Sequence, residues 1–109
     1  FQKVQTGQVT FAARDSEFDG HKIQKDAILA MREGRIVFQD DDPVKAAVRL
    51  IGDMADKSAS YITVIYGEGI TAEQAAAVRD EAGGKLPAQA EINVISGGQP
   101  VYHFIISVE

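Results

Sequence analysis

The sequence predicts an α/β fold in which a mixed β-sheet packs against helices. Apolar runs of strand length, rich in Val, Ile and Tyr, recur along the chain. Two segments with apolar residues at helical spacing lie between them, each preceded by a capping residue. The closing run, residues 101–108, is almost wholly apolar, so we expect it to lie in the middle of the sheet, buried on both faces.

Length and composition indicate a single globular domain spanning residues 1–109, with 45% hydrophobic and 25% charged residues. A net charge of −5 argues against a nucleic-acid-binding face, and no apolar run approaches the ~20 residues of a transmembrane segment. Cysteine is absent, which excludes disulfides and fits a reducing, cytoplasmic location. The first residues lack the pattern of a secretion signal, and the missing initiator Met suggests a piece of a longer chain.

The amino-terminal third predicts strands joined by turns. A strand from about Gly7 places Val9 and Phe11 on the same face, and polar turns follow at residues 14–16 and 19–20. The polar segment at residues 21–26 predicts a loop or a short edge strand.

Residues 27–31 and 36–38 are apolar and flank a glycine-containing turn, a pattern that indicates a hairpin. One helix through residues 27–32 is the alternative, because Ala, Leu and Met favour helices.

The run from Asp40 to Asp42, followed by Pro43, predicts the start of a helix over residues 43–56. The same carboxylates could hold Mg²⁺ only if a loop folded around the ion. The apolar positions at helical spacing are Val44, Ala47, Val48, Ile51 and Met54 or Ala55. The charged face carries Lys45, Arg49, Asp53 and Lys57.

The segment from residue 61 to residue 95 predicts a parallel strand–helix–strand unit. Thr71 caps the helix, and Gln74 completes a capping box. The expected inner face is Ala72, Ala75, Ala76 and Val78, and Gly83-Gly84 ends the helix. The short link after residue 95 predicts a final strand antiparallel to its neighbour.

Candidate chemistry is sparse. Gly67-Glu68-Gly69 lies between a strand and a helix but lacks the rest of a nucleotide-binding motif. His103 could act as a base, although a lone histidine in a strand is more often structural. Residues 97–102 form either a plain turn or an interaction edge that presents Gln99 and Tyr102. No catalytic residue and no metal ligand is predicted.

Several motifs resemble the C-terminal domain of bacterial DAK2-fusion proteins, the dihydroxyacetone kinase-like subunits of fatty acid kinase. The resemblance rests on the motifs Thr6-Gly-Gln-Val-Thr10, Tyr66-Gly-Glu68, Gly97-Gly-Gln-Pro-Val-Tyr102 and the ending Ile105-Ile-Ser-Val-Glu109. It covers nearly the whole chain, and the Ser-Val-Glu ending is its most specific part. The family commonly has an acid at the position of Gly69 and Pro or Tyr near His103, so this sequence departs from it there.

The order of elements is also similar to the C-terminal lobe of DegV-type fatty-acid-binding proteins, which implies a DegV-like, EDD-type lobe. The resemblance implies a non-catalytic domain of a longer kinase subunit that docks a DegV-type partner carrying the fatty acid. ATP and Mg²⁺ would bind an N-terminal domain outside this chain. The expected partner-binding residues are Glu68, Gln99, Tyr102 and His103. An acyl-binding or small-molecule-binding lobe is the alternative function.

Overall fold

The computed structural model describes residues 4–18 and 20–109 of the chain. Residues 1–3, and Asp19 from the second predicted turn, lie outside the described residues. The elements, in chain order, are β1 (Gln5–Phe11), β2 (Ser16–Phe18), β3 (His21–Ile23), β4 (Ile28–Arg32), β5 (Arg35–Asp40), α1 (Pro43–Met54), β6 (Tyr61–Tyr66), α2 (Ala72–Gly83), β7 (Glu91–Ser96) and β8 (Phe104–Val108).

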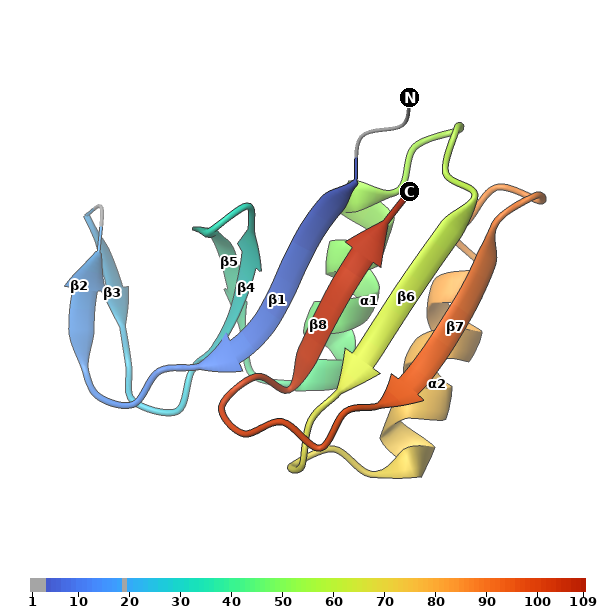
Figure 1. Cartoon of the computed structure of the whole chain (residues 1–109). Helices are drawn as coiled ribbons and strands as arrows, with labels where there is room; N and C mark the ends of the chain where they lie inside the picture. Colours follow the sequence, from blue (N-terminus) through green and yellow to red (C-terminus); the bar gives the residue numbers. More distant parts are fainter. Residues whose placement is uncertain (1–3, 19) are drawn as a thin grey trace.

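Six strands form one mixed sheet in the order β5-β4-β1-β8-β6-β7, while β2 and β3 form a separate hairpin. Figure 1 shows both helices behind the large sheet and the hairpin standing beside it. We call the covered face the helix side, and the other, which no helix covers in the described part of the chain, the open face. The predicted α/β architecture, a mixed sheet packed with helices, is confirmed.

The position of the last strand is as predicted, but its environment is not. β8 pairs antiparallel with both β1 and β6, so it lies inside the sheet. The expectation that it is buried on both faces is wrong, because α1 and α2 both pack on the helix side. Phe104, Ile106 and Val108 are buried there, whereas Ile105 and Ser107 on the open face are only partly buried. The strand also begins later than expected, so Val101 lies in the preceding loop with 56% exposure.

Local chemistry explains both helix starts, and these predictions are confirmed. The Asp42 carboxylate accepts a hydrogen bond from the Val44 N–H at 2.8 Å, and Pro43 occupies the first turn of α1. Thr71 and Gln74 form the predicted capping box of α2. The prediction for the inner face of α2 was partly wrong, because Ala72 is exposed. The buried residues of α2 are Ala75, Val78 and Ala82.

The alternative of a helix through residues 27–32 is wrong, because the β4–β5 hairpin forms there. Its two-residue turn uses Glu33 and Gly34, with φ of 49° and 80°. Positive φ at both central positions gives the twist that a tight hairpin needs. The Glu33 carboxylate also accepts a hydrogen bond from the Thr6 N–H at 2.8 Å, which ties the turn to β1.

The strand–helix–strand unit is parallel, as predicted, with β6 and β7 paired along their whole length. The polar segment after Gly20 forms β3, which pairs with β2, a strand that sequence reasoning did not predict. A small second cluster of Ala12, Ile23 and Leu29 joins this hairpin to the sheet. The structure therefore has one main core on the helix side and a minor one beside the hairpin.

Candidate functional site

Three segments meet at one end of the sheet, where β6 and β7 finish and β8 begins (Figure 1). They are the turn after β6, the link between β7 and β8, and the last residues of β1. We call the first two together, residues 67–69 and 97–103, the loop cluster. All four residues expected to bind a partner lie in it.

Backbone hydrogen bonds hold the loop cluster together. The Gly67 N–H donates to the His103 carbonyl at 2.8 Å, and the Glu68 N–H donates to the Gln99 carbonyl at 3.0 Å. The N–H groups of Gly97 and Gly98 both donate to the Tyr66 carbonyl. The two loops are therefore one hydrogen-bonded unit.

Gln99 is engaged inside this unit. Its side-chain Nε2 donates to the carbonyl oxygens of Ile65 and Tyr102, each at 3.2 Å. The side chain thus supplies a hydrogen-bond donor to the Ile65 carbonyl at the end of β6. Its amide nitrogen is turned toward the protein, so Gln99 shapes the loop more directly than it presents a polar tip.

The close packing explains why glycine stands at the turn after β6. A Cβ atom on Gly67 would collide with the Tyr102 carbonyl oxygen and lie 2.7 Å from that of Gln99. No flexible side chain could move away to make room, because both obstacles are backbone atoms. Glycine is the residue that allows such a close approach of two backbones.

Val101 has an unusual backbone conformation, with φ of 71°. This left-handed region is a genuine outlier for a β-branched residue and costs on the order of 1–3 kcal/mol. Neighbouring contacts hold it: the Thr10 hydroxyl donates to the Val101 carbonyl at 3.0 Å, and the His103 N–H donates to the Val9 carbonyl at 2.8 Å. The result is a valine side chain that is 56% exposed at the tip of the loop.

The outward surface of the loop cluster combines apolar and charged groups. Tyr102 is 38% exposed, Val101 is more so, and Glu68 is exposed beside them. The His103 ring packs against Phe11, with 5.6 Å between the ring centroids. Burial lowers the pKa of His103 below its ordinary value, so the ring is neutral near pH 7.

Gly69 and His103, the two positions where the resemblance leads us to expect other residues, are neighbours in space. A Cβ on Gly69 would lie 3.6 Å from Nδ1 of His103, an ordinary contact distance. A side chain at position 69 would therefore begin in contact with the residue at position 103.

Sequence reasoning included Val101 only within the range 97–102 without singling it out, and it did not place Phe11 beside the loop cluster. Alternation placed Phe11 with the buried Val9, yet Phe11 is 38% exposed because β1 extends beyond the start of β8. No sequence signal distinguishes a valine with positive φ. Gly97-Gly98 indicated a turn but not which neighbouring residue would adopt that conformation.

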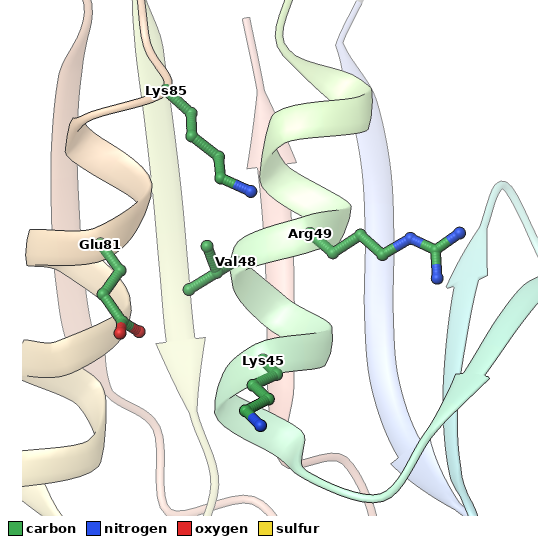
Figure 2. A pocket seen from close by; sticks show the side chains of 5 residues that line it. All are labelled: Lys45, Val48, Arg49, Glu81 and Lys85. Atoms are coloured by element: carbon green, nitrogen blue, oxygen red, sulfur yellow. The ribbon is translucent and has the colours of Figure 1, made fainter.

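The charged face of α1 is the competing surface. A shallow pocket of about 320 Å³ lies between the helices, lined by Lys45, Val48, Arg49, Glu81 and Lys85 (Figure 2). The Arg49 guanidinium is not free there, because it lies 4.0 Å from the centroid of the Phe38 ring and its Nε is 3.9 Å from the Asp53 carboxylate. Arg49 on this face already has partners, whereas the loop cluster exposes apolar groups.

The comparisons with known proteins agree with the resemblance. The family of C-terminal domains from FakA-like fatty acid kinase subunits matches residues 1–109. Protein YloV of Bacillus subtilis (strain 168) is 32% identical over 108 residues, which cover 99% of this chain and 19% of that protein. An uncharacterized protein of Staphylococcus aureus (strain USA300) is 36% identical over 109 residues, covering 97% of this chain and 19% of that protein.

The chain thus spans about a fifth of the length of the curated relatives it matches. Neither of the helices found in residues 4–18 and 20–109 has the length and apolar character needed to cross a membrane. The match extends over every element described above, including both loops of the cluster. The chain belongs to the family of FakA-like fatty acid kinase C-terminal domains.

Proposed function

We propose that this chain is a non-catalytic docking domain of a fatty acid kinase and that the loop cluster is its docking surface. The partner would be a DegV-type protein carrying a fatty acid. ATP and Mg²⁺ would bind another domain of the longer polypeptide, which would phosphorylate the acyl carboxylate in the cytoplasm. The observation that carries this proposal is the exposure of Val101, Tyr102 and Glu68 on a firmly hydrogen-bonded frame.

A preformed frame favours binding. Ordering of loops and side chains at an interface costs roughly 0.5–1.5 kcal/mol for each immobilised side chain. The hydrogen bonds between the turn at Gly67 and the link at Gln99 supply that order before the partner arrives. The position also suits the role, because open α/β sheets bind ligands beyond the carboxyl ends of their parallel strands.

The mixture of side chains suits a protein partner. Tyrosine is enriched at interface hot spots because it combines a large apolar area with one polar group. Tyr102 lies next to the more exposed Val101, and Glu68 adds a charge at the margin that can set orientation.

One observation favours the alternative of a domain that binds an acyl chain itself. An apolar groove of about 370 Å³ lies beside the β2–β3 hairpin, and its lining includes Phe11, Phe18, Ile23, Leu29 and Ile36. The groove is open to solvent, while the larger apolar residues of the main core are already packed against one another. Docking therefore has the stronger support.

Two pairs of variants test the docking surface against the charged helix face. Tyr102→Ala and Glu68→Lys should each weaken binding of the organism's DegV-type protein loaded with fatty acid, with at least a tenfold loss for Tyr102→Ala, equivalent to about 1.4 kcal/mol. The matched control, Lys45→Glu with Arg49→Glu, should alter only the association rate, and only at low salt. Surface plasmon resonance measures both, and circular dichroism confirms that each variant folds.

The opposite pattern would contradict the surface: loss of binding in the helix pair with no change in the loop variants. A fluorescent fatty acid provides the second measurement. Saturable binding to the 109-residue chain alone, lost in Phe18→Ser, would support the acyl-binding alternative instead.

A further inference from the structure

The open face of the sheet carries a row of side chains, apolar on five of its six strands and interrupted by Gln8 on β1. Strand register places one residue of each strand directly beside the next: Ile95, Ile65, Ile105, Gln8, Met31 and Ile36. Five of the six are apolar, and we call this set the open row. Neighbouring strands are about 4.8 Å apart, so the open row is about 24 Å long.

On β7, β6, β8 and β1 the adjacent row on the same face is polar but uncharged, and it ends at Glu33, whose carboxylate accepts a hydrogen bond from the Thr6 N–H. It contains Asn93, Thr63, Ser107 and Thr6. Charged residues make up 25% of the sequence, yet none occupies these ten positions. Depletion of charge around an apolar centre is the pattern found at the core of protein interfaces.

The open row is partly accessible to solvent, and its most exposed member lies on the edge strand β7. Ile95 is 50% exposed on β7, and Ile65, Ile105 and Met31 are only partly buried. At the far end, Ile36 lines the groove beside the β2–β3 hairpin. A contiguous uncharged surface of this kind is characteristic of a contact region rather than of a free surface.

The length of related proteins points to what could cover the open row. The 108 matched residues are 19% of the Bacillus subtilis relative, which is therefore about 570 residues long, and roughly 460 of them lie outside this region. The start of β1 pairs with the end of β8, so Gln5 lies beside Val108 at the polar end of the open face. Gln5 is three residues from Gln8 on β1, so a preceding domain attached there begins about 10 Å from the open row.

We propose that the open row is the surface on which another domain of the same, longer polypeptide packs. A tethered domain is present at millimolar effective concentration, so a moderate apolar contact is enough to keep the row covered. A separate partner would leave the row exposed whenever it dissociated. A second copy of the chain would bring another net charge of −5 to the contact. This inference rests on family membership and on the sheet register, and it is independent of the docking role.

Cysteine labelling tests the proposal directly, because this region contains no cysteine of its own. Ile95→Cys reports on the open row, and Arg79→Cys on the exposed surface of α2 is the matched control. Each is placed in the 109-residue chain and in the full-length polypeptide. The rate of alkylation by iodoacetamide is then followed by mass spectrometry of the labelled peptide.

We expect Ile95→Cys to react at least tenfold more slowly in the full-length polypeptide than in the 109-residue chain, with the Arg79→Cys rates within twofold. Ile105→Cys, a second reporter at the centre of the row, should follow Ile95→Cys, and adding Ile95→Asp should restore its reactivity. Equal rates in both polypeptides would overturn the proposal. So would protection that appears only at higher protein concentration, which indicates a second copy, or only when the fatty-acid-loaded partner is added.

Discussion

The two faces of the central strand β8 have opposite environments although their residues look alike in the sequence. Phe104 and Ile106 have no exposure on the helix side, whereas Ile105, which lies between them, remains partly exposed on the open face. The cause is the location of α1 and α2, which cover the same face of the sheet (Figure 1). An apolar strand thus shows that it lies inside a sheet, but not that both of its faces are covered within the same domain.

The strongest test of this comparison removes the strand shared by both faces. Deleting residues 101–109 should abolish folding, because β1 and β6 both lose their partner. The buried residues Phe104, Ile106 and Val108 each contribute roughly 1.5–3 kcal/mol. Their sum is comparable to the typical stability of a domain, about 5–15 kcal/mol. Thermal unfolding followed by circular dichroism is the measurement, and a cooperative transition near the parent temperature would show that the core lies elsewhere.

Two neighbouring residues separate the faces with a smaller change. Ile106→Ala opens a cavity in the main core and should lower the free energy of unfolding by about 2–5 kcal/mol. Ile105→Ala makes the same chemical change on the open face and should cost about 1 kcal/mol or less in the 109-residue chain. Urea unfolding of both variants measures the difference. Equal losses would mean that the open face is as tightly packed as the helix side.

The sequence predicts those features of the structure that depend on residues close together in the chain. Asp42, Thr71 and Gln74 cap the helices through side chains only a few residues from the groups that they bind. The turn at Glu33-Gly34 is equally local. These features could be predicted because local geometry alone determines their hydrogen bonds.

Features that depend on how distant strands align could not be predicted. The open row exists because six strands adopt one register, and the short β2 strand forms only because β3 lies beside it. The candidate site shows the same division. Sequence motifs identified both loops of the cluster, but the inward hydrogen bonds of Gln99 and the exposure of Val101 depend on contacts across the sheet.

The loop cluster differs from both faces of β8, because hydrogen bonds and backbone geometry rather than burial hold it in place. Val101→Gly should relieve the left-handed backbone strain and raise the free energy of unfolding by up to about 1 kcal/mol. Affinity for the fatty-acid-loaded partner should fall in the same variant, because the exposed side chain is lost. Urea unfolding and surface plasmon resonance measure the two effects. A loss of stability would show that the valine side chain stabilises the loop rather than being available to contact the partner.

The smallest expected effect concerns pH and tests the packing of the His103 ring against Phe11. Burial holds the pKa of His103 in the folded chain below its ordinary value of about 6.5. As the pH falls below that value, the unfolded chain takes up a proton that the folded chain resists, so unfolding becomes easier. The free energy of unfolding should therefore decline as the pH falls through about 6.5, and His103→Gln should remove most of that decline.

The other histidine, His21, is exposed on β3 and provides the matched control. His21→Gln should retain the pH dependence of the parent chain, because His103 still resists protonation. Urea unfolding at a series of pH values measures all three proteins. A decline that disappears in His21→Gln and persists in His103→Gln would contradict the packing of His103 against Phe11. Solvent would then reach the ring freely.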